Sequence, residues 1–152
     1  MAVLNWDVRD VAPSAPWDDK HKTEWRTEFR GHVLTVLRTR GAFECWVQKA
    51  GDERKISHTQ GLRSLDRAQE HVVEAAVLVL NGRAVSDEEY DAINLPLYTD
   101  LAETYETAAR RVAEAGLYGE ELNLKMQADR YRREADVIRR AVAQRLAKET
   151  AR

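Results

Sequence analysis

The sequence predicts an α+β fold, in which a three-stranded antiparallel sheet packs on one helix and is followed by an antiparallel helical hairpin. Three observations carry this prediction. Residues 25–60 are rich in β-branched and aromatic residues and are interrupted by short turns, residues 64–80 repeat apolar residues at three- and four-residue spacing, and residues 86–152 hold two longer helical patterns. We therefore expect three regions: an irregular arm over 1–24, a βββα domain over 25–83 and a helical hairpin over 86–152.

The strands are expected over 25–39, 42–49 and roughly 54–60. Arg40-Gly41 forms the first predicted turn, and Ala50-Gly51-Asp52 forms the second, where Gly51 can adopt a positive φ. Because both turns are short, the three strands should form an antiparallel meander.

Helix signals follow the sheet. Ser64 is a good N-cap for a helix over 64–80, and Ser86 with Glu89 forms a capping box. Pro96 predicts a break, so we expect a short helical turn to Ile93 and a main helix that begins with Asn94 as its cap. That helix should end near Gly116, and the last should run from about 119 to 148.

Charge supports the pairing of these two helices. Residues 86–118 carry a net charge of -6 and residues 119–152 carry +3, so neighbouring helices would bear opposite charge. The last helix is expected to be about 10 residues longer than its neighbour, an overhang of ~15 Å. We predict that its apolar stripe, partly on this overhang, meets the sheet domain, a second chain or another partner through Tyr131, Ile138, Val142 and Leu146.

The expected sheet has two different faces. The first is apolar and should pack on the following helix through Trp25, Phe29, Val33, Leu37, Phe43, Cys45 and Val47. The second is both basic and apolar, and its predicted binding residues are Arg30, His32, Leu34, Val36, Arg38, Trp46, Gln48, Arg54 and His58. Three occupants of this second face stay open: a protein partner, DNA, or the chain itself, through Trp6 and Trp17 of the arm or through the hairpin.

Composition excludes several classes. The chain has 152 residues, a net charge of -2 and 43% apolar residues, which favours a folded protein without an overall basic field. It has no apolar run near the ~20 residues that cross a bilayer, and its N-terminus lacks the features of a signal peptide. The single cysteine, Cys45, favours a reducing, cytoplasmic setting.

Catalytic signatures are absent from the sequence. We find no glycine-rich phosphate loop, no nucleophile elbow and no His-Glu-x-x-His pair, so we expect neither an enzyme nor a cofactor. His32 and His58, with Glu44 as the nearest third ligand, form too loose a set to predict a metal site.

The run Gly61-Leu62 to Ala76 leads from the last expected strand into the helix. With the three-stranded meander before it, this run resembles the AP2-type domain and is similar to the arm-binding domain of phage-type integrases. Gly61, Leu62, Ser64, Ala68, Ala75 and Ala76 carry the resemblance, which covers residues 25–80. It implies a phage or mobile-element accessory protein whose sheet face enters the DNA major groove through Arg38, Trp46, Gln48 and Arg54.

Two functions follow from these observations. The first is a non-catalytic protein-interaction or assembly module, acting on a host partner or as a homodimer, which the near-neutral charge and the heptad-like last helix favour. The alternative is a DNA-binding accessory or regulatory protein, which the net charge of +3 over residues 25–85 favours.

Overall fold

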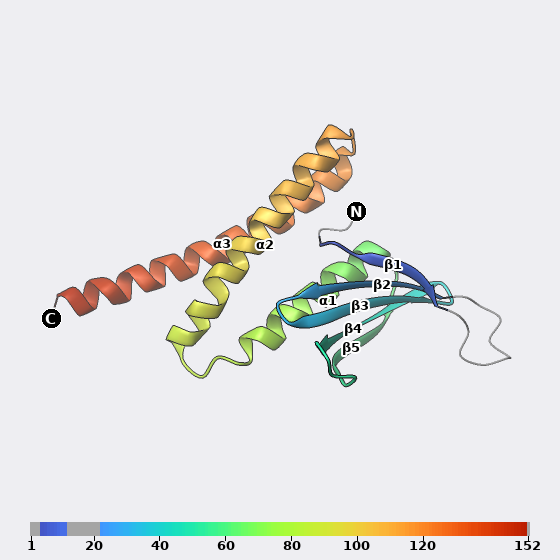
Figure 1. Cartoon of the computed structure of the whole chain (residues 1–152). Coiled ribbons are helices and arrows are strands. Elements are labelled where there is room, and N and C mark those ends of the chain that lie inside the picture. Colours follow the sequence, from blue (N-terminus) through green and yellow to red (C-terminus); the bar gives the residue numbers. More distant parts are fainter. Residues whose placement is uncertain (1–3, 12–21, 152) are drawn as a thin grey trace. The chain divides into compact units, whose positions relative to one another are not determined.

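The computed structural model describes residues 4–11 and 22–151. The chain divides into two compact units, Ala2–Leu80 and Asn81–Arg152, and each is described by itself. The first holds a sheet and helix α1 (Leu65–Asn81), and the second holds helices α2 (Asp87–Glu114) and α3 (Tyr118–Thr150) (Figure 1). The predicted α+β fold with a C-terminal helical hairpin is confirmed, but the sheet has five strands and not three. Trp17, expected to pin the arm, lies outside the described residues.

The sheet is an antiparallel meander with the strand order β1-β2-β3-β4-β5. Its strands are β1 (Asp7–Val11), β2 (Lys22–Phe29), β3 (His32–Thr39), β4 (Ala42–Lys49) and β5 (Lys55–Leu62). The prediction of an irregular arm is wrong for residues 7–11, because β1 pairs with β2 and places Val8 opposite Trp25. The N-terminal region thus contributes the edge of the sheet.

The single strand predicted over 25–39 is also wrong, because Arg30-Gly31 turns the chain and divides it into β2 and β3. Arg30 and Gly31 have φ values of 51° and 78°, and Arg40 and Gly41 repeat this conformation at 47° and 84°. Two successive positive φ angles are typical of a type I′ turn, whose twist matches that of an antiparallel hairpin. The two Arg-Gly dipeptides therefore close two equivalent hairpins.

Helix α1 covers the face of the sheet that carries Cys45. Thr59 pairs with Cys45 in the β-ladder, and the Thr59 hydroxyl lies 3.0 Å from His71 Nε2 of α1. Figure 1 shows α1 running along one side of the strands. The helix begins after Ser64, whose hydroxyl accepts a hydrogen bond from the Arg67 N–H. It buries an apolar stripe formed by Ala68, Val72, Val73, Ala76, Val77 and Leu80.

The two-residue turn Arg40-Gly41 fixes which β3 residues share a face with Trp46. Leu34 pairs with Val47, and Val36 pairs with Cys45, so both belong to the face beneath α1. Each is fully buried, at 0% exposure. We predicted Leu34 and Val36 beside Trp46; that assignment is wrong, because a two-residue turn pairs even-numbered residues of β3 with odd-numbered residues of β4.

Helices α2 and α3 form an antiparallel hairpin. The capping box is present: Ser86 Oγ accepts from the Glu89 N–H at 3.2 Å, and Glu89 Oε2 accepts from the Val85 N–H at 3.0 Å. At the other end of α2, Gly116 has a φ of 78°. The Leu117 N–H reaches Val112 O and the Gly116 N–H reaches Ala113 O, which is the Schellman arrangement.

The predicted break before Pro96 is wrong, since α2 continues through this residue for 28 residues in all. Pro96 has no N–H, so the carbonyl four residues earlier loses its helical partner. Nearby, Asn94 is fully buried inside the helix and donates through Nδ2 to the Tyr90 carbonyl at 2.8 Å. Asn94 is therefore an interior residue of α2 and not its cap. Within the described residues, no helix has the length and apolarity needed to cross a membrane.

Candidate docking cleft at the open end of the hairpin

The closed part of the hairpin is held by a stack of tyrosines. The Tyr131 ring of α3 stacks on Tyr98 and Tyr105 of α2, with centroids 5.9 and 5.6 Å apart. Tyr131 is 3% exposed, and Ile138, two helical turns further along α3, is 5% exposed. Two of the four residues that we predicted to meet a partner are thus buried in the hairpin's own core.

Polar contacts between the helices fix their register. Arg132 binds Glu106 at 2.8 Å, Arg139 donates to the Thr99 hydroxyl at 3.3 Å, and Arg145 forms an ion pair with Asp91. In each pair the acidic or hydroxyl partner comes from α2 and the cation comes from α3, as the charge pattern predicted. Continued by one turn, this register brings Glu88 to the level of Glu149.

The helices separate toward the start of α2 and the end of α3 (Figure 1). Pro96 lies inside α2, within this part of the hairpin. A cleft of about 350 Å³ lies between the two diverging segments. We call it the open-end cleft; it is lined by Glu88, Asp91, Ala92, Leu95, Val142, Arg145, Leu146 and Glu149.

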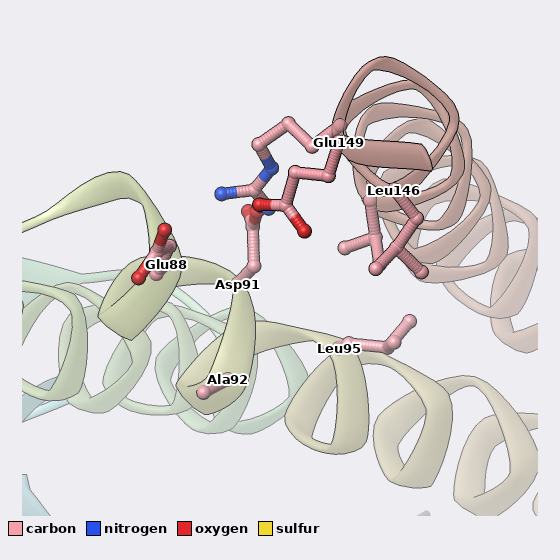
Figure 2. A pocket seen from close by; sticks show the side chains of 8 residues that line it. Glu88, Asp91, Ala92, Leu95, Leu146 and Glu149 are labelled. Carbon is pink, nitrogen blue, oxygen red and sulfur yellow. The ribbon is translucent and has the colours of Figure 1, made fainter. Parts of the chain in front are cut away.

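The floor of the open-end cleft is apolar. Figure 2 shows Leu146 of α3 facing Leu95 of α2 across the opening, and Val142 completes the apolar lining. Leu146 is 57% exposed, a large value for a leucine on a helix that packs elsewhere. Unlike Tyr131 and Ile138, the predicted partner residues Val142 and Leu146 thus line an open surface.

The mouth of the open-end cleft is acidic. Its lining holds three carboxylates (Glu88, Asp91 and Glu149) and one guanidinium (Arg145), a net charge of -2. Asp91 is neutralised by Arg145, and its side chain is only 15% exposed. Glu88 and Glu149 have no cationic partner among the described residues, and they come from the first turn of α2 and the last turn of α3. The cleft therefore passes from apolar inside to negative outside.

Metal-ligating and nucleophilic groups were also sought among the described residues. No cluster of three or more potential metal ligands occurs in the described part of the chain. Cys45 is buried elsewhere, beneath α1, and burial raises the pKa of its thiol to about 11, so the nucleophilic thiolate is scarce near neutral pH. A cleft of this size and lining instead suits one or two apolar side chains.

The second face of the sheet, the other predicted site, is centred on Trp46. The indole is only 9% exposed. Its Nε1 donates to Gln48 Oε1 at 3.0 Å, Lys55 Nζ lies 4.0 Å from the ring centroid, and His58 meets the ring edge-on. Gln48 in turn donates to the Glu53 carbonyl at 2.7 Å. Trp46 and Gln48 thus bond within the sheet.

The remaining predicted residues are not brought together on this face. His32 is buried on the opposite face with Leu34 and Val36, far from the His58–Glu44 pair, whose atoms are 2.8 Å apart. Arg38 pairs with Phe43 and belongs to the α1 side. Arg30 lies in the β2–β3 turn, and Arg54 lies just before β5 beside Asp52. These four predicted binding residues therefore do not form one surface with Trp46.

Sequence reasoning missed the α2 half of the open-end cleft, namely Glu88, Asp91, Ala92 and Leu95, as well as Arg145 and Glu149 on α3. The cause was Pro96, since a break there removed the first turns of α2 from the hairpin. The signal that could have found these residues is the charge register, in which acidic positions on α2 match arginines on α3.

Comparison with known proteins adds no family: no protein-family model, curated protein or solved structure matches this chain.

Proposed function

We propose that this protein is a non-catalytic interaction module that docks apolar side chains of a protein partner in the open-end cleft. The observation that carries the proposal is the cleft itself, an apolar recess of about 350 Å³ with Leu146 57% exposed at its edge. Two diverging helices present Leu95 and Val142 inside the recess, and an incoming helix laid between them would complete a three-helix contact.

The DNA-binding alternative has less support. Of the four residues that the resemblance implicates, Arg38 lies on the α1 side, Trp46 is buried, and Gln48 is bonded to the β4–β5 turn. Arg38 and Arg54 are both exposed, but they do not share the Trp46 face, and Arg54 lies 3.8 Å from Asp52. Charges on the Trp46 face are also mixed, because Glu24 holds both Arg9 (2.8 Å) and Arg26 (3.4 Å). A DNA reader needs an excess of cations.

A selection experiment tests the proposal without a known partner. A library of random 18-residue peptides, displayed on messenger RNA, would be selected against the immobilised full-length chain. Enriched peptides would then be measured against Leu146→Ser and against Leu122→Ser. Leu122 is a matched control, since it lies on the same helix and is 63% exposed but does not line the cleft.

We expect the leading peptides to lose affinity about ten-fold or more for Leu146→Ser, because burying a leucine side chain contributes roughly 1.5–3 kcal/mol. Leu122→Ser should bind as the parent does. Peptides that bind both variants equally well would overturn the proposed docking site. A parallel gel-shift assay with duplex DNA at ~50 mM salt tests the alternative, since phosphate binding is strong under these conditions.

A further inference from the structure

The chemistry of the partner can be read from the gradient of polarity along the cleft. On α2 the lining runs from Leu95 inside to Glu88 at the mouth, and on α3 it runs from Val142 to Glu149. The distance along the chain from Leu95 to Glu88, like that from Val142 to Glu149, is seven residues, which is two helical turns or about 10 Å. Both walls therefore change from apolar to anionic over the same length and in the same direction.

The two outer carboxylates lack a cationic partner. The register of the hairpin sets Glu88 and Glu149 at the same level, one on each wall, and no cation of the described residues pairs with either. The only arginine of the lining, Arg145, is engaged by Asp91. A positive charge brought by a ligand would be attracted to both carboxylates.

We infer that the partner segment is a basic amphipathic helix, which sets an apolar side chain on the floor formed by Leu95, Val142 and Leu146 and a lysine or arginine between Glu88 and Glu149. This inference rests on the proposed function and specifies its partner. Since Leu95 and Val142 lie about 10 Å along their helices from Glu88 and Glu149, an apolar anchor placed on these two residues and the cation should be seven residues apart on the partner helix. An acidic or purely apolar helix has no cation to place between Glu88 and Glu149.

Two neighbouring surfaces do not offer the same combination. The outer side of α3 near the closed end exposes Tyr118, Leu122 and Met126, but these residues do not line the open-end cleft. Glu121, in the same stretch, is already paired with Lys125 at 2.6 Å. The open-end cleft is distinguished by having an apolar recess and unpaired carboxylates on the same two walls.

The test uses the peptides enriched by the selection described above, with the full-length chain. The first expectation is compositional: enriched sequences carry a lysine or arginine seven residues from a leucine, isoleucine or methionine more often than the starting library does. The second is a charge swap: replacing that cation by glutamate in the leading peptide weakens its binding ten-fold or more, measured by fluorescence anisotropy at ~50 mM salt.

The matching change in the protein is the double substitution Glu88→Gln and Glu149→Gln. It should weaken binding of the leading peptide about five-fold at ~50 mM salt, and the difference should shrink at ~500 mM salt, where charges are screened within ~4 Å. Glu114→Gln with Glu120→Gln is the control, because it removes the same charge at the opposite end of the hairpin. Glu114 is 26 residues from Glu88, about 39 Å along α2, and beyond the range of screened charge effects.

The outcomes separate the two proposals. Binding that depends on Leu146 but is unchanged by Glu88→Gln and Glu149→Gln, at both salt concentrations, would overturn the inference and leave the docking site in place. Equal effects of the mouth and control double substitutions would overturn it as well, because the charge effect would then be nonlocal. Binding that is indifferent to Leu146 would overturn both.

Discussion

Replacing Trp46 with alanine tests whether the second face of the sheet is part of the protein's core. Because the indole is only 9% exposed, truncation removes nearly all of its buried surface. A tryptophan buries ~150–250 Å², which at ~25 cal/mol per Å² corresponds to about 4–6 kcal/mol. Substitutions of this kind in other cores cost ~3–5 kcal/mol. We therefore expect Trp46→Ala to lower the free energy of unfolding by about 3–5 kcal/mol.

The lost contacts are specific and not only apolar. Lys55 Nζ lies 4.0 Å from the ring centroid, and the His58 ring meets the indole at an angle of 82°. Gln48 loses the donor that its Oε1 accepts from at 3.0 Å, although this exposed amide can rebond to water. Together these contacts contribute about 1 kcal/mol, so burial decides the magnitude of the loss.

Urea denaturation followed by tryptophan fluorescence is the appropriate assay. All four tryptophans of the sequence precede the hairpin, and the three described ones (Trp6, Trp25 and Trp46) belong to the unit that holds the sheet, so their fluorescence reports on that unit. Circular dichroism at 222 nm, dominated by the helices, would follow the hairpin in parallel. Three tryptophans remain as reporters in the variant.

Ile56→Ala is the control, since Ile56 is also on the sheet but is 48% exposed. It should change the free energy of unfolding by no more than ~0.5 kcal/mol, which is typical of exposed positions. A loss below ~1 kcal/mol for Trp46→Ala would refute the reasoning. It would mean that the Trp46 face is open, and it would return that face to the list of candidate binding surfaces.

Four further predictions concern local features. Arg40→Asn should raise the free energy of unfolding by ~0.5–1 kcal/mol in urea melts, because Asn tolerates the φ of 47° better than Arg; a loss of stability would contradict the assigned turn. Ser86→Ala should lower the thermal stability of the hairpin by ~1 kcal/mol, since the Glu89 N–H loses its acceptor; an unchanged melting curve would show that the cap is not needed. Burial raises the pKa of the Cys45 thiol to about 11, against an unfolded value of 9.0. Cys45 should therefore react with dithionitrobenzoate at pH 8 only as fast as the sheet unfolds, and rapid labelling of the folded chain would refute its burial. The contribution of the neutral thiol to stability should be lost as the pH rises from about 9 through 11. Pro96→Ala should stabilise the hairpin by ~1–3 kcal/mol in thermal melts, because the added N–H restores the helical hydrogen bond that proline lacks; an unchanged or lowered stability would contradict this account of Pro96.

Much of the fold could be predicted because its signals are local. Ser64, Ser86 and Gly116 mark helix ends through hydrogen bonds and dihedral preferences that involve only a few neighbouring residues. The opposite charges of α2 and α3 likewise predicted the pairing seen in Arg132–Glu106 and Arg145–Asp91.

The errors in the predicted strand and helix boundaries came from two sites, Arg30-Gly31 and Pro96, whose structural effect depends on the surrounding residues. Arg30-Gly31 was read through as strand, although Arg40-Gly41 was read as a turn, since arginine at a positive φ carries no sequence signal of its own. His32, Leu34 and Val36 were placed on the wrong face for a separate reason, since the two-residue turn Arg40-Gly41 pairs even-numbered residues of β3 with odd-numbered residues of β4. Pro96 was read as a break, but the packing of α2 on α3 holds the helix together on both sides of it.

The candidate site could be predicted only in half for the same reason. Val142 and Leu146 were identified by the apolar stripe of the last helix. Their counterparts on α2, Leu95 and Glu88, became visible only once the helix continued through Pro96 and the register brought its first turns opposite the end of α3. A cleft between two helices depends on where they diverge, which a periodic pattern does not encode.

The most direct test of the docking cleft is a nuclear magnetic resonance titration of the methyl-labelled full-length chain with the leading selected peptide. The account predicts that the largest shift changes fall on the methyl groups of Leu95, Val142 and Leu146, while those of Leu122 and of Leu34 stay in place. Changes centred on Leu122 at the closed end, or on the sheet, with Leu95 and Leu146 unmoved, would contradict it.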